Sequence, residues 1–208
     1  MFEVTERGDV FVDARLYDWR TKVFMLGAVS RAYGRAAGLV VNDSTRRVLD
    51  VGTGTGAMAF ALKQRRPAAE VHGIDPGEGM LDVARTNGVR LGRVVHFRPG
   101  WAQDLPFANE EFDAVTFAHV LRHIPVPQRH AVLAEARRVL RPGGRVLIVD
   151  IVPAGLAVAL APRLAYPVDL DGCARVLKAT GFTDVRAGRL SRVLFGYAVG
   201  RRPGRAPA

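Results

Sequence analysis

The sequence predicts an α/β fold of three layers: a doubly wound, mostly parallel sheet of seven strands with helices on both faces. Two observations carry this prediction. From Arg46 onward, continuously apolar runs alternate with helical patterns, which is typical of parallel strands buried on both faces. Near the C-terminus, two strand-like runs at 182–189 and 192–201 are joined by a turn too short for a crossover helix. These two strands must therefore be antiparallel, and the sheet has one reversed strand at its C-terminal end.

The elements of this fold are expected in a regular order. Strands are predicted at the short apolar runs 46–52, 69–75, 93–97, 112–120 and 144–152. Helices are predicted between them over 57–64, 78–85, 127–140 and 169–180. Gly143 and Gly144 are expected to cap the long helix and to start the fifth strand, and Gly181 is expected to close the last helix.

Length and composition fit one soluble domain. With 208 residues, 49% of them hydrophobic and 24% charged, the chain is not a disordered or fibrous protein. We expect an N-terminal helical cap over 1–42, with one or two helices in 9–40, a main domain over 43–200 and a disordered basic tail over 201–208. The single cysteine, Cys173, excludes an internal disulfide. The start of the chain has no signal-peptide pattern, and the longest apolar run is about half of a membrane span, so a cytoplasmic location is expected.

The net charge of +10 raises the question of a nucleic-acid partner. Only three of the 30 basic residues are lysines, and the arginines are scattered along the whole chain rather than clustered. This scatter does not favour a nucleic-acid partner. An anionic substrate or a peripheral contact with a membrane surface remains open.

The most informative segment is the glycine loop that follows the first predicted strand. Gly52, Gly54 and Gly56 allow a sharp turn and a close approach of the backbone to a ligand. An acid about 20 residues later, Asp75, suits a dinucleotide fingerprint as well as other nucleoside sites. Asp50, two residues before the first glycine, repels a pyrophosphate but can hold an ammonium group. Together with the antiparallel last strand, it argues against a plain nicotinamide-binding domain.

Four motifs resemble those of class I S-adenosylmethionine-dependent methyltransferases. They read LDVGTGTG at 49–56, GIDPGEGML at 73–81, DLPFANEEFDAV at 104–115 and LRPGGRVLIVD at 140–150. Their order and spacing are most similar to those of the UbiE-like branch of small-molecule methyltransferases. The resemblance is strongest over residues 45–150 and implies S-adenosylmethionine as the cofactor, with S-adenosylhomocysteine as the product.

The resemblance implies roles for the residues of these motifs. The three glycines shape a loop around the methionyl and ribose groups, Asp75 accepts hydrogen bonds from the ribose hydroxyls, and Met80 packs on the adenine ring. A helix N-cap at Asp75 with Pro76 at the first helical position, and a core role for Met80, remain alternatives. The implied cofactor-binding residues are Asp50, Gly52, Thr53, Gly54, Thr55, Gly56, Asp75, Pro76, Met80, Trp101, Ala102, Gln103 and Ala118.

The adenine end departs from the family pattern. Relatives typically have Gly-Asp-Ala before the LPF element, whereas this chain has Gly100-Trp101-Ala102. The indole of Trp101 has no hydrogen-bond acceptor, although its ring can stack on or cover the adenine. We expect the backbone around Ala102, or the side chain of Gln103 or Asp104, to bind the adenine edge instead.

The candidate catalytic residues follow the fourth predicted strand, where a parallel sheet presents its carboxyl ends to ligands. Arg122 matches an arginine of the resembled branch, and His123 stands where that branch has asparagine. His119 is the third candidate, since a histidine titrates near neutrality and can take a proton from an acceptor. The alternative is that the two histidines are partly buried residues that fix a loop. No metal-ligand pattern accompanies them, so no metal is expected.

The predicted function is methylation of an oxygen or carbon atom of a small molecule such as a quinone, a phenol or a secondary metabolite. The apolar segment 152–170 and the N-terminal helices are expected to close the acceptor pocket, which favours an apolar or aromatic acceptor. Candidate wall residues are Tyr17, Trp19, Tyr166 and Asp171. A non-catalytic cofactor-binding protein, an RNA methyltransferase and a nicotinamide-dependent oxidoreductase remain alternatives. Either a monomer or a homodimer is compatible with the sequence.

Overall fold

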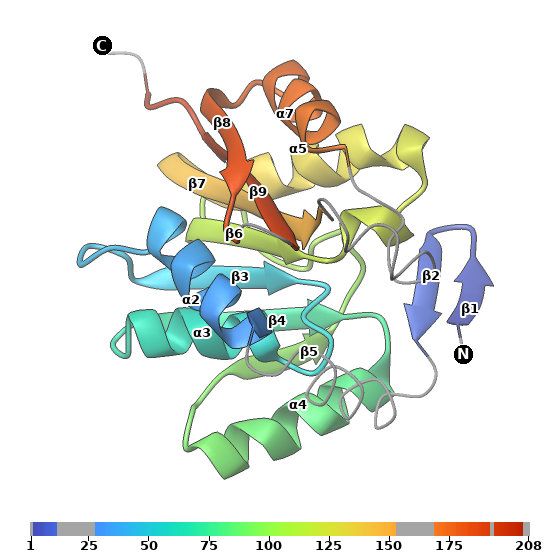
Figure 1. The fold of residues 1–208 in the computed structure, drawn as a ribbon, viewed down its shortest axis with the longest axis vertical. Helices are drawn as coiled ribbons and strands as arrows, with labels where there is room; N and C mark the ends of the chain where they lie inside the picture. The colour runs from blue at the N-terminus through green and yellow to red at the C-terminus, as the bar shows by residue number, and fades with distance from the viewer. Residues whose placement is uncertain (1, 12–27, 153–168, 192–193, 206–208) are drawn as a thin grey trace.

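The computed structural model describes residues 2–11, 28–152, 169–191 and 194–205. Their main feature is a seven-stranded sheet with the strand order β5-β4-β3-β6-β7-β9-β8 (Figure 1). Its strands are β3 (Arg47–Val51), β4 (Glu70–Asp75), β5 (His96–Pro99), β6 (Phe112–Ala118), β7 (Leu140–Ile151), β8 (Thr183–Arg189) and β9 (Phe195–Arg201).

The pairing of the strands confirms the predicted fold class. The five strands β5, β4, β3, β6 and β7 are parallel, whereas β9 is antiparallel to both of its neighbours, β7 and β8. The reversed strand is therefore β9, which lies between β7 and β8.

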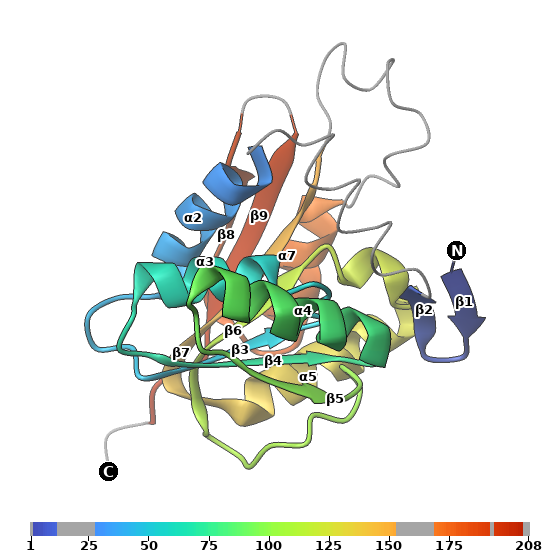
Figure 2. The ribbon, with the colours of Figure 1, turned by 90° about the horizontal axis from the view of Figure 1, so that it is seen from below.

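Helices cover both faces of the sheet (Figure 2). On one face lie α2 (Ala28–Val40), α3 (Ala57–Arg65) and α4 (Glu78–Leu91), and on the other lie α5 (Arg129–Val139) and α7 (Leu170–Ala179). Neighbouring residues of β3 show why its apolar side chains follow one another without alternation. Val48 packs with the α2 and α3 side of the core and Leu49 with the α5 and α7 side, and both are fully buried.

The N-terminal segment differs from its prediction. Residues 2–11 form an antiparallel hairpin of β1 (Phe2–Thr5) and β2 (Gly8–Phe11), not part of a helical cap, and its two strands form a sheet of their own. The hairpin lies beside the carboxyl ends of the parallel strands (Figure 1). Two four-residue strands around a tight turn give little periodicity, which is why the apolar spacing alone missed them. The predicted helical content is confirmed over 28–40, and residues 12–27 lie outside the described part.

Several element boundaries also differ. Helix α4 continues to Leu91, where Gly92 ends it with φ 61°, and β5 begins at His96 rather than at residue 93. The predicted cap at Gly143 and Gly144 is wrong: α5 ends at Val139, and both glycines lie within β7, near an irregularity in its pairing with β6. Gly181, with φ 84°, follows α7 as predicted.

The basic end of the chain is ordered as far as it is described. Arg201 belongs to β9, and Arg202 donates hydrogen bonds to backbone carbonyl oxygens at the end of α5. Arg202 and Arg205 each form an ion pair of 2.8 Å with Glu110. These bonds replace the predicted disorder over 201–205, and residues 206–208 lie outside the described part. None of the helices in the described ranges is long and apolar enough to cross a membrane.

Candidate active site

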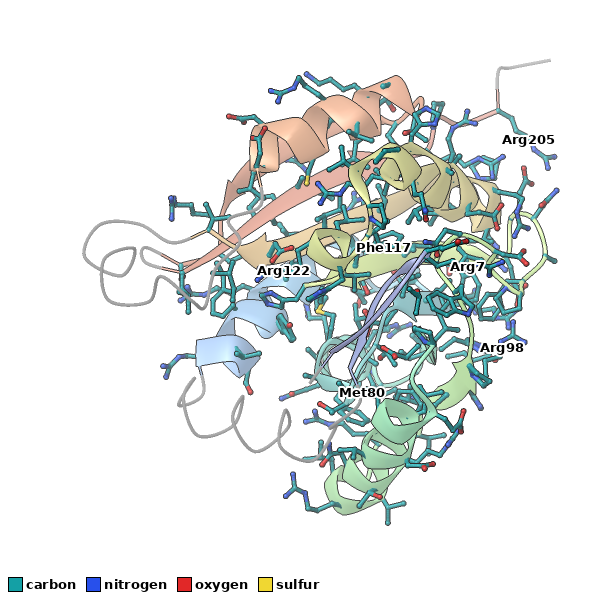
Figure 3. All side chains as sticks on the ribbon, turned by 90° about the vertical axis from the view of Figure 1, so that its right-hand side faces the viewer. Arg7, Met80, Arg98, Phe117, Arg122 and Arg205 are labelled. Atoms are coloured by element: carbon teal, nitrogen blue, oxygen red, sulfur yellow. The ribbon has the colours of Figure 1, made fainter. Side chains whose placement is uncertain are left out.

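The glycine loop of residues 52–56 joins β3 to α3 at the carboxyl edge of the sheet. Strand β3 lies between β4 and β6. The next two strands of the chain, β4 and β5, lie on one side of β3, whereas β6 and β7 lie on the other side, so the strand order reverses at β3. Open α/β sheets bind ligands at such a switch point. Figure 3 views the molecule from this edge, with Met80 and Arg122 labelled near the β1–β2 hairpin.

The three glycines of this loop have different surroundings. A Cβ at Gly52, where φ is 64°, would lie 2.5 Å from Cγ2 of Val120, and one at Gly56, where φ is 89°, would lie 2.6 Å from the ring of Phe60. Both glycines are therefore required by packing as well as by the turn. A Cβ at Gly54, where φ is 53°, would meet no atom of the described residues within 4 Å. The backbone at Gly54 thus faces open space, where a ligand can approach it.

Asp75 ties this open backbone to the next strand. Its Oδ2 accepts a hydrogen bond of 2.8 Å from the N–H of Gly54, and its Oδ1 accepts one of 2.9 Å from the N–H of Gly77. Each carboxylate oxygen keeps a lone pair for a further donor. Burial raises the pKa of Asp75, and the two backbone bonds partly oppose this shift. Asp75 is not the N-cap of α4, because Gly77 occupies that position and Pro76 precedes it.

Asp50 lies behind the loop rather than on its surface. It is 1% exposed and accepts hydrogen bonds from the hydroxyl groups of Thr53, at 2.7 Å, and Thr116, at 2.6 Å. Burial raises the pKa of Asp50 to about 6, against the opposing effect of these two hydroxyl groups. A carboxyl group with this pKa responds readily to a positive charge bound nearby.

Three further predicted cofactor residues differ in their exposure to solvent. Thr55 is buried, and its carbonyl oxygen accepts a hydrogen bond of 3.2 Å from the side chain of Asn87. Met80 is 2% exposed and belongs mainly to the core, whereas Pro76 is partly exposed. Asn87 was not predicted from the sequence, although a polar residue on the buried face of a helix is a signal that could have found it.

Trp101 is joined to the N-terminal hairpin. The guanidinium of Arg7 lies 5.7 Å from the centroid of the Trp101 ring, within reach of a cation–π interaction. The side chain of Gln103 donates a hydrogen bond of 2.6 Å to the carbonyl oxygen of Arg7. A Cβ at Gly8, where φ is 129°, would lie 2.4 Å from the carbonyl oxygen of His123. The hairpin turn therefore contacts both the segment of Trp101 and Gln103 and the candidate catalytic segment, which the sequence did not reveal.

The candidate catalytic segment begins at Ala118, the partly exposed last residue of β6. His119 follows in a left-handed conformation with φ 60°, and its N–H donates to the carbonyl oxygen of Val149 at 2.8 Å. The short helix η1 (Leu121–His123) comes next. Arg122 forms an ion pair with Asp150, and Nδ1 of His119 lies 3.2 Å from the same carboxylate oxygen, Oδ1.

This arrangement brings two of the three predicted catalytic residues together. His119 and Arg122 share Asp150, whereas the backbone carbonyl group of His123 lies against Gly8. Burial, together with the charge of Arg122, lowers the pKa of His119 to about 3. His119 is therefore neutral at physiological pH. Asp150 was missed, although an acid inside the apolar run VLIVDIV is an unusual feature.

The predicted acceptor-wall residues are only partly tested. Tyr17, Trp19 and Tyr166 lie outside the described residues, and Asp171 is exposed in the first turn of α7. Within the described ranges, no group of three or more His, Cys, Asp or Glu residues is arranged to hold a metal ion.

Comparison with known proteins gives the family. A family profile described as a methyltransferase domain matches residues 48–144, from β3 to β7. The demethylmenaquinone methyltransferase of Thermus thermophilus is 39% identical over 66% of this chain and 61% of its own length. The ubiquinone/menaquinone biosynthesis C-methyltransferase UbiE of Desulfotalea psychrophila is 36% identical over 73% of this chain and 57% of its own length. The chain thus spans about three fifths of the length of these relatives.

A solved structure supports the same fold. An S-adenosylmethionine-dependent methyltransferase from Thermotoga maritima, described as a possible histamine N-methyltransferase, has a TM-score of 0.68 at 19% identity and covers 91% of this chain and 97% of its own. These matches support the assignment of this chain to the class I S-adenosylmethionine-dependent methyltransferases. Within this class it is close to UbiE and the demethylmenaquinone methyltransferases.

The residues present fit the cofactor of this family. The uncovered backbone at Gly54 allows the close approach of a nucleoside, and Asp75 beside it has lone pairs for ribose hydroxyl groups. A bound methionyl ammonium would favour the ionised form of Asp50, whose pKa burial raises to about 6.

Proposed function

We propose that this chain transfers the methyl group of S-adenosylmethionine to an oxygen or carbon atom of a small acceptor of the quinol or phenol type. The bond between Asp75 and Gly54 carries the proposal, because it leaves carboxylate lone pairs beside backbone that no side chain within the described ranges covers. The kind of acceptor is supported by the relatives, which are named as methyltransferases of menaquinone and ubiquinone biosynthesis.

On the cofactor side, Asp75 accepts hydrogen bonds from the ribose hydroxyl groups, and the backbone from Gly52 to Gly56 lies along the methionyl group. Asp50 acts from behind the loop as the counter-charge of the ammonium. Pro76, Met80, Trp101, Ala102 and Gln103 form the adenine end. Since Trp101 offers no hydrogen-bond acceptor, the adenine amino group is bound by backbone groups of this segment.

On the acceptor side, the main task of the chain is alignment. When bound, S-adenosylmethionine supplies a methyl group that is already activated by its sulfonium. The residues around Ala118 must hold the acceptor atom in line with the methyl group and exclude water. The acceptor atom forms its bond to the methyl carbon while the carbon–sulfur bond breaks, the electron pair stays on sulfur, and the acceptor loses a proton. A base is needed only where that proton leaves before or during the attack.

The remaining parts of the proposal concern the surroundings of the enzyme. The acceptor is a small apolar or aromatic molecule rather than a nucleic acid. The enzyme acts in the cytoplasm, as a monomer or a homodimer, and peripheral contact with a membrane gives access to a lipophilic acceptor. The three exposed valines and the leucine of the described surface leave apolar area for such a contact; they are Val89, Leu91, Val94 and Val126.

The test is an acceptor panel with S-adenosylmethionine as donor. Naphthohydroquinones, catechols, simple phenols and structured RNA are incubated with the full chain, and S-adenosylhomocysteine and the mass of each acceptor are measured. Formation of S-adenosylhomocysteine with a hydroquinone or phenol that gains one methyl group supports the proposal. Tight binding of S-adenosylhomocysteine without turnover on any acceptor identifies a non-catalytic binding protein. Methylation of the RNA alone, or stabilisation by NAD instead of S-adenosylhomocysteine, contradicts the proposal.

A further inference from the structure

We propose that Asp150 is a positioning residue of this site, which fixes the guanidinium of Arg122 and the tautomer of His119 so that both can bind a hydroxyl-bearing acceptor. The inference rests on the proposed function and deepens it. It adds a residue, and it narrows the acceptor to a molecule with a hydroxyl group, or its oxyanion, at or beside the methylated atom.

The exposures of the three side chains separate their roles. The side chain of His119 is 15% exposed, that of Arg122 is 10% exposed, and that of Asp150 is fully buried. A ligand can therefore touch the first two but not the third. Asp150 must act through His119 and Arg122, as a buried carboxylate commonly does when it orients a histidine.

The hydrogen-bond chemistry determines the tautomer of His119. Oδ1 of Asp150 accepts hydrogen bonds from Arg122 and from the N–H of Ile151, at 2.7 Å for the latter, and lies 3.2 Å from Nδ1 of His119. An ionised carboxylate only accepts hydrogen bonds, so the proton of the neutral imidazole belongs on Nδ1. The other ring nitrogen, Nε2, then carries a lone pair that can accept a hydrogen bond from a hydroxyl group.

Charge balance keeps this arrangement fixed. A buried carboxylate is very costly without a cation, and Arg122 supplies that cation to Asp150. The burial of the ring, and to a lesser extent the positive charge of Arg122, disfavour protonation of His119, so its pKa is lowered to about 3. Arg122 therefore offers the methyl-accepting molecule a cationic hydrogen-bond donor, and Nε2 of His119 offers it a neutral hydrogen-bond acceptor. These are the partners of a hydroxyl oxygen that gains negative charge during the reaction.

The backbone holds the pair against the glycine loop. His119 has φ 60°, an uncommon conformation for a residue with a side chain, and its N–H is bound to Val149. Val120, between His119 and Arg122 in the chain, packs so closely on Gly52 that a Cβ there would lie 2.5 Å away. The two side chains thus belong to a segment in contact with the loop assigned to the cofactor.

The first test measures the tautomer directly, without any acceptor. Long-range ¹H–¹⁵N NMR of the full chain with ¹⁵N-labelled histidine is expected to show His119 neutral from pH 6 to 8, with its proton on Nδ1. In Asp150→Asn the amide oxygen is retained by Arg122 and the amide N–H groups face His119, so the proton is expected to move to Nε2. A proton on Nε2 in the unmodified chain, or a protonated ring at pH 7, overturns the inference even if Asp150→Asn does not fold.

The second test separates this inference from the proposed function. Asp150→Asn should keep the dissociation constant of S-adenosylhomocysteine within about twofold. It should lower kcat at least tenfold with a naphthohydroquinone. With a substrate whose neighbouring oxygen is methylated, the substitution should have little effect on kcat. Asp113→Asn is the matched control, since Asp113 pairs with Arg141 at the opposite end of β6 and should leave kcat unchanged. If the unmodified chain does not bind S-adenosylhomocysteine, the proposed function is refuted. Unchanged kcat in Asp150→Asn refutes the positioning role alone.

Discussion

The carboxylate of Asp75 lies 2.8 Å from the backbone nitrogen of Gly54 and accepts its hydrogen bond across the gap between β3 and β4. This bond has two consequences. It holds the glycine loop in the shape that leaves Gly54 uncovered, and it places the acid beside the space that the loop leaves open. We therefore expect the stability of the loop and its affinity for a nucleoside to depend on the same side chain.

Replacing Asp75 by alanine should therefore weaken cofactor binding. We expect the dissociation constant of S-adenosylhomocysteine, measured by isothermal titration calorimetry, to rise about tenfold to a hundredfold, which corresponds to about 1–3 kcal/mol for hydrogen bonds to a charged group. Asp82→Ala is the control, because Asp82 is an exposed carboxylate of α4 whose ion pair with Arg85 faces solvent. An unchanged affinity in Asp75→Ala would remove the ribose assignment.

Two glycine substitutions in the loop should differ in whether they mainly affect ligand affinity or folding stability. Gly54→Ala places a methyl group in open space, so we expect a loss of stability of about 1 kcal/mol from the left-handed backbone and a large loss of affinity for S-adenosylhomocysteine. Gly52→Ala collides with Val120, so we expect it to cost about 3 kcal/mol of folding free energy. Urea unfolding and calorimetry distinguish the two. If Gly54→Ala binds as tightly as the unmodified chain, no ligand lies against this backbone.

Asp50 predicts a pH dependence of stability. Its pKa in the folded chain, about 6, exceeds the unfolded value of 3.8, so the folded state retains a proton that the unfolded state has lost between these pH values. The contribution of Asp50 to stability is complete below pH 4 and falls as the pH rises to 6. Asp50→Asn keeps the shape of the side chain and removes this titration. The free energy of unfolding of Asp50→Asn minus that of the unmodified chain should therefore rise by about 2 kcal/mol from pH 4 to pH 7.

The measurement is urea unfolding of both chains at several pH values, because the difference between them cancels the titration of the other acids. A constant difference would show that Asp50 is not a buried acid with a raised pKa. The binding of S-adenosylmethionine should depend on pH in the opposite direction to stability. A bound ammonium favours the ionised form of Asp50, so S-adenosylmethionine should bind more tightly as the pH rises through 6 in the unmodified chain, and this dependence should be absent in Asp50→Asn.

Gly8 should be required for docking of the hairpin. A side chain at this position would strike the carbonyl oxygen of His123, so Gly8→Ala should separate the hairpin turn from η1. Hydrogen–deuterium exchange is expected to increase at residues 6–8 and 121–124 and to stay unchanged in β3. Gly34→Ala is the control, since Gly34 lies in α2 and a Cβ there meets no atom within 4 Å. Equal exchange in Gly8→Ala and the unmodified chain would contradict the described contact.

The sequence was sufficient for the sheet and the glycine loop because both depend on local patterns. Val48 and Leu49 are apolar in succession because each faces a different layer of helices, and glycines at 52, 54 and 56 all have positive φ angles. Such patterns are visible within a few residues. These patterns predicted that the last two strands are antiparallel, but they did not predict the order of the other strands in the sheet.

Contacts between distant segments could not be predicted in this way. Gly8 lies against His123, and Arg122 pairs with Asp150, but neither spacing in the chain has a periodicity that indicates the contact. For the same reason the sequence favoured His123, which occupies the position of a family motif, whereas the structure pairs His119 with a buried carboxylate. The end of α5 was predicted to within one residue, but the capping role of Gly143 and Gly144 was wrong, because these glycines lie in an irregular part of β7.

The most direct test of the account is the crystal structure of the chain with S-adenosylhomocysteine. We expect both ribose hydroxyl groups within hydrogen-bond distance of the Asp75 carboxylate and the ligand in contact with the backbone at Gly54. Electron density for the ligand in a different cleft, with the loop from Gly52 to Gly56 unbound, would contradict the central claim that this bend holds the methyl donor.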